Sequence, residues 1–572
     1  MTKEFKTYRI LSFVNIGCAA LFSLLNLNLK ADISLSALPL ALVFTVLNAY
    51  FVIYKAIIKT DGTKIYGIIK STEYLPYVLM ISFILRRAGE NGTPFVVDLI
   101  QVITWIVVFV LSYLTSRKLY EKRNENLVKG WAVPPKPLKF TGIQKILFET
   151  VDWIDAIVWS IFTVLVFQIF FLQLYEIPSE SMVPTFLIKD RVFVSKIECG
   201  PKFPLTDIGL PDLRKYKRGD TIVLRNPHYN MDRKSEVKSV TSNLVTMLTL
   251  TAVNINRDEN GDLKADPLVK RITGLPGEQL VMQDGTLYRR TKESDIFEPV
   301  EIDNKYAAWN LNAINPKIKN KVQNYPLSPE EYNNMISFEE ERRNYDLNVA
   351  SIEAQELVRK FKKLAFKDNL IGKYENKSLY EYNLFKNVEE ISRNLMCQEG
   401  GTKWFEEFMT SWIPSKNNVR DIYEESNYRL NVMSKLIFGN LVIKYAEFFV
   451  NGVSATEWGN DASFLSYYGS AETLHWYIQI LLDLRNMPVF PADDSDGNPQ
   501  YIPNNCYFMM GDNRFNSLDL RHSYDDVEKP LTNDDPKSLT YYSMMAPQYI
   551  NKRLIVGKPI FRFWPLNRLG KV

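Results

Sequence analysis

Residues 154–186 read IDAIVWSIFTVLVFQIFFLQLYEIPSESMVPTF, and this stretch joins two unlike parts of a 572-residue chain. Its first part, Ile154–Leu174, is apolar and long enough to cross a bilayer, which takes about 20 predominantly apolar residues. Its second part, Ile177–Phe186, is short and polar at its centre. Long apolar runs fill the chain before this junction, whereas tyrosine and charged residues are common after it. We therefore expect a membrane region followed by a soluble region.

Further apolar runs precede the junction, so the membrane region is expected to hold several helical spans. The first run is slightly short and the third carries Lys70 and Glu73, so four spans and five spans both stay open. No small-residue cleavage site follows the first run, which is therefore expected to be a retained anchor. The runs are Ile10–Leu27, Leu35–Ile57, Tyr66–Leu85 and Phe95–Thr115.

The distribution of lysine and arginine orients these spans. Both residues are concentrated at the N-terminus, in the second loop and above all in the fourth loop, between Arg117 and Lys145. Loops rich in positive charge stay on the cytoplasmic side of a membrane. The chain after Leu174 is therefore expected on the opposite, extracytoplasmic side.

Charge and composition argue against two other classes of function. The net charge is +4, which is too small to predict nucleic acid as the main partner. The three histidines and four cysteines lack metal-ligand spacing, so we expect neither a metal site nor a disulfide framework. A single bridge between Cys199 and Cys506 stays open.

The soluble region has the pattern of a mostly-β fold, because short apolar runs alternate with turn residues. Asp284-Gly285 and Asn451-Gly452 are typical of hairpin turns. The predicted strands are Arg191–Ile197, Thr221–Leu224, Val269–Ile272, Gln279–Met282 and Ile560–Trp564.

The segment 293–441 breaks this β pattern. Ser328, followed by Pro329 and Glu331, is typical of a helix start, and residues with helical spacing follow it. We expect a helical insertion carried by the β region, with a solvated charged face favoured over a partner-binding surface. The apolar stretch Val240–Val253 is expected in the core, with a place at the bilayer surface as the alternative.

Ser181 and Lys270 are the candidate catalytic pair. Pro178 and Pro184 restrict the backbone on either side of Ser181. A serine hydroxyl is a poor nucleophile until a base takes its proton, and a lysine can be that base when burial lowers its pKa. Lys270 lies within the strand-like run Leu268–Ile272. From this pattern alone, a surface lysine on an edge strand is the simpler interpretation.

Four segments together resemble bacterial signal peptidase I, a family of membrane proteases with a serine–lysine dyad. They occur in the family's order, which makes the combination far more specific than any one of them. The matched core is Tyr175–Leu287 plus about 501–565, a minority of the chain. The segments are IPSESMVPT (177–185), RGDTIV (218–223), LVKRITGLPG (268–277) and GDNRFNSLDLR (511–521).

The resemblance implies a role for each matched residue. Ser181 attacks the scissile carbonyl, and Lys270 takes its proton. Ser179 and the backbone N–H of Ser181 donate to the oxyanion, while Ser517 orients the Lys270 amine. The structural supports are Arg271, Asp519 and Arg521. The shallow pockets for small P1 and P3 side chains are walled by Ile177, Pro178, Met182, Phe186, Leu268 and Val269.

Two residues qualify this assignment. Phe186 stands where a smaller aliphatic residue is common in the family, which predicts a narrowed or reshaped P1 pocket. His522 follows the last segment directly, and it is expected to be a bystander because Lys270 is present.

Together, the residue patterns and the resemblance predict a multi-span α-helical membrane region followed by a mostly-β extracytoplasmic catalytic domain of the signal peptidase type, with a helical insertion; the resemblance covers only the catalytic core, and the membrane bundle and the insertion rest on the residue patterns. The membrane bundle and basic loop cover 1–151, and the last transmembrane anchor covers 152–176. The two parts of the catalytic domain cover 177–292 and 442–572, on either side of the insertion at 293–441.

The implied function is the removal of signal peptides from secretory preproteins at the bacterial cytoplasmic membrane, with the catalytic domain on the periplasmic side and no cofactor. The alternative is a catalytically inactive membrane-anchored protein of the same fold that binds signal peptides or partners. The presence of all four catalytic-type residues favours the peptidase. A self-cleaving repressor with the same dyad is disfavoured, because the chain has membrane spans and no DNA-binding element.

Overall fold

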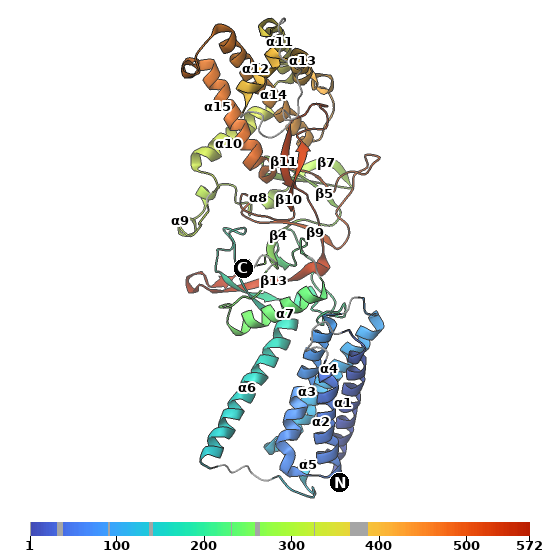
Figure 1. Cartoon of the computed structure of the whole chain (residues 1–572). Coiled ribbons are helices and arrows are strands. Elements are labelled where there is room, and N and C mark those ends of the chain that lie inside the picture. The colour runs from blue at the N-terminus through green and yellow to red at the C-terminus, as the bar shows by residue number, and fades with distance from the viewer. Residues whose placement is uncertain are drawn as a thin grey trace.

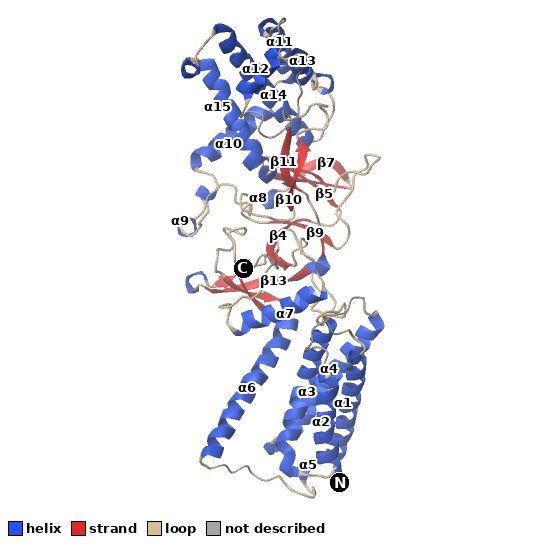
Figure 2. Cartoon of the chain, viewed as in Figure 1, coloured by secondary structure: helices blue, strands red, loops and turns tan. Residues whose placement is uncertain are grey.

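The computed structural model describes residues 2–30, 38–89, 92–135, 141–229, 232–257, 264–324, 326–366 and 387–572. The chain is arranged in three tiers (Figure 1). Helices of the first part form one end, β-sheets form the middle, and a second group of helices forms the far end. Colouring by secondary structure separates the tiers clearly (Figure 2).

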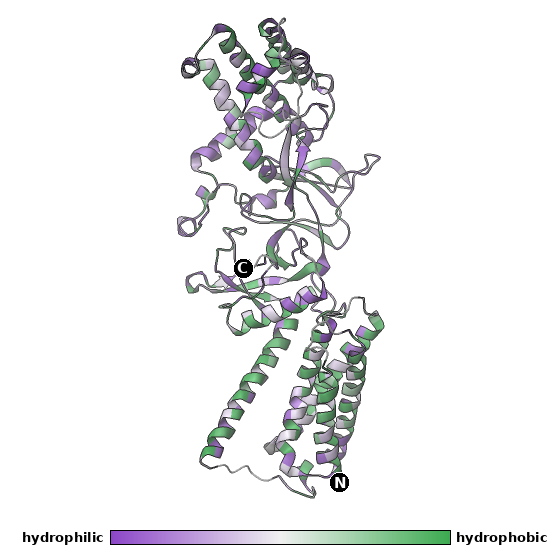
Figure 3. Cartoon of the chain, in the orientation of Figure 1, coloured by the Kyte–Doolittle hydropathy of each residue, from purple (hydrophilic) through white to green (hydrophobic). Residues whose placement is uncertain are grey.

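Within the described residues, five helices are long and apolar enough to cross a membrane. Hydrophobic residues predominate along these helices, whereas hydrophilic residues are more frequent in the rest of the chain (Figure 3). The second of the predicted runs begins at Leu35, and its first residues, 35–37, lie outside the described residues. The helices of this tier are α1 (Lys3–Leu27), α2 (Leu40–Ala49), which continues as the π-helical η2 (Tyr50–Ile58), α3 (Ile65–Arg87), α4 (Phe95–Lys118), the short α5 (Glu121–Val128) and α6 (Ile143–Phe170).

Helices α1 to α4 form one bundle in which buried polar side chains bond across the helix interfaces. Hydrogen bonds of this kind stabilise helix association in an apolar medium, where the hydrophobic effect between helices is absent. The pairs are Asn15 Nδ2 with Ser112 Oγ at 3.1 Å, Asn26 Nδ2 with Ser82 Oγ at 3.0 Å, and Asn48 Nδ2 with Ser71 Oγ at 3.1 Å.

Helix α6 leans away from this bundle and leads into the β tier (Figure 1). Its contact with α3 includes an ion pair of 2.7 Å between Lys70 Nζ and Asp155 Oδ2. The predicted span Ile154–Leu174 is wrong at its C-terminal end, because the helix stops at Phe170 and Leu172–Glu176 is strand β1. Apolarity alone does not separate a helix end from a strand, whereas pairing of β1 with β2 fixes the strand here.

The central sheet has eight strands and unites segments that are far apart in the sequence. Strand β4, which carries Lys270, pairs with β3 on one side and with β9, from beyond residue 500, on the other. The order along the sheet is β1-β2-β13-β3-β4-β9-β12, with β14 beside β13. The strands are β1 (Leu172–Glu176), β2 (Arg191–Ser195), β3 (Thr221–Leu224), β4 (Leu268–Gly274), β9 (Cys506–Met510), β12 (Ile550–Asn551), β13 (Ile555–Trp564) and β14 (Gly570–Lys571).

A second, four-stranded sheet holds the connection to the far helices. The predicted turn at Asp284-Gly285 is confirmed: both residues have positive φ, as a two-residue hairpin requires. The chain leaves this sheet after β7 and returns at β8, which pairs with β5. The strands are β5 (Glu278–Gln283), β6 (Thr286–Thr291), β7 (Ser294–Pro299) and β8 (Met487–Phe490), and a separate ribbon consists of β10 (His522–Pro530) and β11 (Thr540–Met545).

Helices occupy the chain between β7 and β8. The predicted helical segment ended at 441, but helices continue to Arg485, so residues 442–485 are not the β segment that was expected. Asn451-Gly452 is no hairpin turn, because Gly452 at φ 65° ends a long helix. The helices are α8 (Glu301–Asn304), α9 (Pro316–Lys319), α10 (Pro329–Arg343), α11 (Leu347–Leu364), α12 (Val388–Cys397), α13 (Gly401–Thr410), α14 (Ile422–Asn451), α15 (Ala462–Trp476) and α16 (Leu482–Arg485).

Local sequence explains where two of these helices begin and end. The predicted start of α10 is confirmed, because Ser328 and Glu331 form a reciprocal capping box with Pro329 at the first turn. Glycine tolerates the left-handed conformation that Gly452 adopts after α14. The apolar core of this tier is built around α14, whose buried residues lie on nearly every face.

The stretch 240–253 belongs mostly to another helix, α7 (Arg233–Leu248), which lies across the end of α6 (Figure 1). The expected core position is only partly right, since Val240 and Leu244 pack against a buried cluster but Leu248 and Leu250 are exposed. All four cysteines are free, so the bridge between Cys199 and Cys506 is not formed.

Candidate active site

Ser181 lies in a tight loop between β1 and β2. Ser181 is half-buried, and Ser179 beside it is exposed, with 3.3 Å between the two Oγ atoms. The neighbouring Asn513 N donates to the Ser181 carbonyl oxygen at 3.1 Å. The loop is thus attached to the segment 511–521, which follows β9.

Lys270 lies in β4, opposite Ile222 of β3, and its side chain is only 3% exposed. Its Nζ donates to Ser517 Oγ at 3.1 Å. Burial lowers the pKa of Lys270 from its usual 10.5 to about 8, although the carboxylates of Asp519 and Asp512 act in the opposite direction. About a tenth of Lys270 is therefore the neutral amine at pH 7, far more than for an ordinary lysine, as a general base requires.

Gly511 lies where the serine loop meets Ser517. A Cβ atom built on Gly511 would lie 2.2 Å from Ser517 Oγ and 2.5 Å from the Ser181 carbonyl oxygen. The backbone of Ser181 and the side chain that holds Lys270 therefore meet across a position that only glycine can fill. Among the described residues, no hydrogen bond joins Ser181 Oγ to Lys270 Nζ directly, and such contacts are often long before substrate binds.

Asp519 is the centre of a buried hydrogen-bond network behind Ser517. Its carboxylate accepts from Ser517 Oγ at 2.8 Å, from Gly511 N at 2.9 Å and from Arg521 Nε at 2.9 Å. Burial alone would raise the pKa of Asp519, but the Arg521 guanidinium outweighs it and holds the pKa well below the usual range. The carboxylate is therefore ionised and fixes the direction of the Ser517 hydroxyl.

Arg271, the neighbour of Lys270, pairs with Asp512, a residue that the sequence analysis did not single out. The two side chains form a double hydrogen bond with both N–O distances at 2.7 Å, and Asp512 is fully buried. The guanidinium also lies 3.7 Å from the ring centre of Tyr306. The signal for Asp512 was present, since it belongs to the quoted segment 511–521, whereas nothing indicated Tyr306.

The predicted pocket residues divide into two groups. Ile177, Met182 and Phe186 are buried in one apolar cluster, and Val269 packs against it. Leu268 instead packs against a different cluster, because alternation along β4 turns it to the other face of the sheet. Pro178 is exposed.

Glu180, between the two serines, was missed entirely. It is 3% exposed, and its carboxylate accepts hydrogen bonds from the backbone N–H groups of Gln323 and Asn324, the latter at 3.0 Å. The serine loop is therefore fixed to the segment that precedes α10. No sequence pattern relates residues so far apart.

His522 is buried, and its Nε2 lies 3.3 Å from the Asp483 carbonyl oxygen. Burial, together with the nearby Arg521 charge, lowers the pKa of His522 to about 4. The imidazole is therefore neutral at physiological pH.

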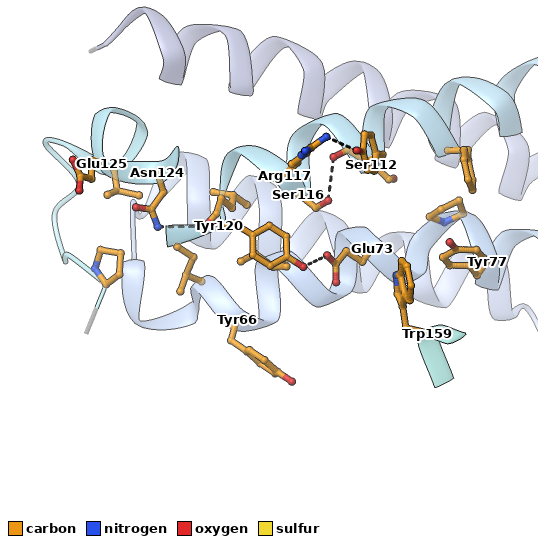
Figure 4. Close-up of a pocket in the computed structure, with 18 of the residues that line it drawn as sticks. Tyr66, Glu73, Tyr77, Ser112, Ser116, Arg117, Tyr120, Asn124, Glu125 and Trp159 are labelled. Atoms are coloured by element: carbon orange, nitrogen blue, oxygen red, sulfur yellow. Dashed lines mark hydrogen bonds between the residues drawn. The ribbon is translucent and has the colours of Figure 1, made fainter. Parts of the chain in front are cut away.

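A cavity of about 1230 Å³ lies elsewhere, in the first helical tier between α3, α4, α5 and α6. The Tyr120 hydroxyl donates to Glu73 within it, and Tyr77 and Trp159 line its other end (Figure 4). Its walls are mostly apolar, and it shares no residue with the Ser181 site.

In the comparison with known proteins, the family model and the relatives described here are all signal peptidases. The sequence model of the family described as Signal peptidase, peptidase S26 matches residues 150–361. A Signal peptidase I of Buchnera aphidicola is 29% identical over 133 residues, covering 23% of this chain and 39% of the relative. One from Haemophilus influenzae is 26% identical over 210 residues, covering 36% and 57%. One from Bacillus licheniformis is 26% identical over 170 residues, covering 30% and 63%.

The predicted resemblance to bacterial signal peptidase I is confirmed by these matches. The chain spans between 39% and 57% of the length of the first relatives that it matches. No solved structure matches the chain. The comparisons give no support to the non-catalytic alternative.

Proposed function

We propose that this chain is a membrane-anchored serine endopeptidase that removes signal peptides from exported preproteins, with Ser181 as nucleophile and Lys270 as general base. The observation that carries this proposal is the state of Lys270: a buried amine of lowered pKa, hydrogen-bonded to Ser517 and adjoining the Ser181 loop. The similarity to signal peptidase I supports the same assignment.

In the first chemical step, Ser181 Oγ bonds to the scissile carbonyl carbon while its proton passes to Lys270 Nζ. The negative charge that develops on the carbonyl oxygen is stabilised by the backbone N–H of Ser181 and the hydroxyl of Ser179. Breaking the C–N bond releases the mature protein, whose new amine takes the proton from Lys270. Water then attacks the acyl carbon while Lys270 Nζ takes its proton, and breaking the bond to Ser181 Oγ releases the signal peptide as Lys270 returns that proton to Oγ.

The surroundings of Lys270 suit this cycle. Ser517 holds the amine in position, and Asp519 holds Ser517. Arg271 is engaged by Asp512, and it supports the strand without taking part in proton transfer. His522 is too weak a base to act in place of Lys270 at neutral pH, because its pKa is lowered to about 4.

The apolar cluster around Met182 and Phe186 forms the place where the substrate side chains before the cleaved bond would bind. Phe186 is fully buried there, so it limits the depth of the pocket and favours small side chains before the cleaved bond. Helix α6 leads directly into β1 and the serine loop, which keeps the site close to the bilayer in which signal peptides reside. With the basic loop on the cytoplasmic side, the catalytic domain lies on the periplasmic side.

The test compares wild type, Ser181→Ala and Lys270→Met in vesicles with a labelled preprotein whose signal ends in Ala-X-Ala. Wild type should release the mature product, and both variants should release none. Ser454→Ala, at an exposed serine, is the matched control and should cleave like wild type. Cleavage by the Ser181 variant at the wild-type rate would exclude Ser181 as nucleophile. Binding of the preprotein without any cleavage by wild type would favour the non-catalytic alternative.

A further inference from the structure

A small polar pocket of about 210 Å³ lies where the membrane helix α6 passes into the β tier. Strand β1 contributes Gln173, the ends of β2 and β3 contribute Lys196 and Arg225, and α7 covers the pocket with Glu236 and Asn243. None of these residues belongs to the Ser181 site, and the peptidase reaction does not use them.

Gln173 is the first sign that the pocket is built for a ligand. Its side chain is 1% exposed and interacts with the Tyr175 hydroxyl, but within the described part of the chain neither Nε2 nor Oε1 has a partner at full hydrogen-bond geometry. A buried polar atom without a partner loses its hydration without replacement, so native structures rarely tolerate it. One carboxamide lining a cavity thus offers both a donor and an acceptor.

Lys196 is the second sign. Its Nζ forms no ion pair with any carboxylate of the described residues, although the side chain is half-buried. Burial and the positive charge of Arg225 lower the pKa of Lys196 to about 7. The amine is therefore protonated only in part at neutral pH, and a bound anion would favour its charged form.

The two acidic groups of the pocket are already engaged. Asp266 Oδ2 lies 3.3 Å from Arg225 Nη1, and Glu236 Oε2 lies 3.2 Å from Arg233 Nη1. Lys196 is left without a carboxylate partner among the described residues, and Arg225, held by Asp266 through Nη1 alone, lies beside it with the Gln173 amide in the same cavity. A tetrahedral oxyanion offers several acceptors to donors that converge in this way.

The position of the pocket indicates where such an anion could come from. Helix α6 ends at Phe170, only a few residues before Gln173, and the carbonyl oxygen of Phe171 accepts from Lys196 N at 3.0 Å. The pocket is therefore level with the end of a membrane-spanning helix, where phospholipid headgroups lie.

We propose that this pocket binds a phosphate group between Lys196 and Arg225, with Gln173 as an additional donor. The phosphate is that of a phospholipid headgroup or a free phosphate ion, two sources with the same chemistry. Binding would fix α7 and the start of β1 relative to the membrane surface.

The first experiment measures thermal unfolding of the full-length protein in a phosphate-free, lipid-free neutral detergent. Inorganic phosphate, against chloride at equal ionic strength, should raise the unfolding temperature of wild type. Lys196→Gln should need about tenfold or more phosphate for the same rise, as expected for one lost charge-assisted hydrogen bond. Lys238→Gln, at an exposed lysine of α7, should behave like wild type.

A second arm distinguishes the sources by replacing phosphate with vesicles of phosphatidylglycerol or of an uncharged glycolipid. A rise with the phospholipid alone assigns the headgroup, and a rise with inorganic phosphate alone assigns the free ion. Gln173→Met, which removes the unpaired amide at similar volume, should weaken either response while leaving the protein folded. No response of wild type to either probe, or equal responses of wild type and Lys196→Gln, would overturn the proposal.

Discussion

The pH dependence of cleavage is the most direct test of Lys270 as the base. Burial lowers its pKa to about 8, so the neutral, active form should be about a tenth of the enzyme at pH 7, half at pH 8 and nine-tenths at pH 9. We therefore expect kcat/KM to rise about tenfold from pH 7 to pH 9 and to level off above pH 9.

An ordinary lysine gives a different curve. With its usual pKa of 10.5, the neutral fraction would rise about tenfold per pH unit, or about a hundredfold between pH 7 and pH 9, without levelling off. The two cases differ by about a factor of ten over a range in which rates are easily measured.

The assay follows release of mature protein at low substrate concentration, with the Ser181→Ala variant measured at each pH to subtract background hydrolysis. Unfolding is monitored in parallel, so that loss of folded enzyme at high pH is not mistaken for titration. A hundredfold rise without a plateau, or a limb near pH 6.5 that indicates a histidine, would refute the assignment of a buried Lys270 as the base.

Three further predictions concern single residues. Gly511→Ala should lower kcat by about ten- to a hundredfold, because the added Cβ would lie within 2.5 Å of Ser517 Oγ and the Ser181 carbonyl oxygen, and overpacking costs about 1–3 kcal/mol. Gly459→Ala, with open space around it, should keep the wild-type kcat, and equal activity of the two variants would exclude the close contact at Gly511. Glu180→Gln should lower kcat about tenfold or more with little change in KM, because the backbone N–H groups of Gln323 and Asn324 lose their charged acceptor. Glu330→Gln, at an exposed glutamate, is the control, and a wild-type kcat in the Glu180 variant would exclude Glu180 as a positioning residue. Lys270→Met should abolish cleavage but raise the unfolding temperature at pH 7. The reason is that a lysine of lowered pKa destabilises the fold by up to about 3 kcal/mol below about pH 8 and not at all above about pH 10.5. Thermal scans between pH 7 and pH 10 should show the difference in unfolding temperature between variant and wild type shrinking, and a variant less stable than wild type at pH 7 would contradict the prediction.

Patterns of short range were readable from the sequence. The apolar runs predict the helices that could cross a membrane, because a helix in lipid must satisfy its own backbone and remain apolar along its whole length. The capping box at Ser328 and the hairpin turn at Asp284-Gly285 depend only on adjacent residues, and both are confirmed. The order of the four matched segments was sufficient for the resemblance to signal peptidase I.

Boundaries were less predictable. The end of α6 at Phe170 and the extension of the helices to Arg485 both lie within apolar or mixed sequence that suits either helix or strand. Pairing partners decide such cases, as β1 shows with β2, and partners are set by the whole fold.

The sequence by itself indicated the apolar helices that are long enough to cross a membrane, the β character of the middle tier and the identity of Ser181 and Lys270 as candidates. Only the tertiary structure decided that Lys270 is buried, that Ser517 and Asp519 hold it, and that Glu180 is bonded to the backbone at Gln323. The physical reason is that burial and hydrogen bonding depend on which distant segments pack together. A lysine in an apolar strand has the same local pattern on an exposed edge as in a buried centre, and the pairing of β4 with both β3 and β9 makes it central here.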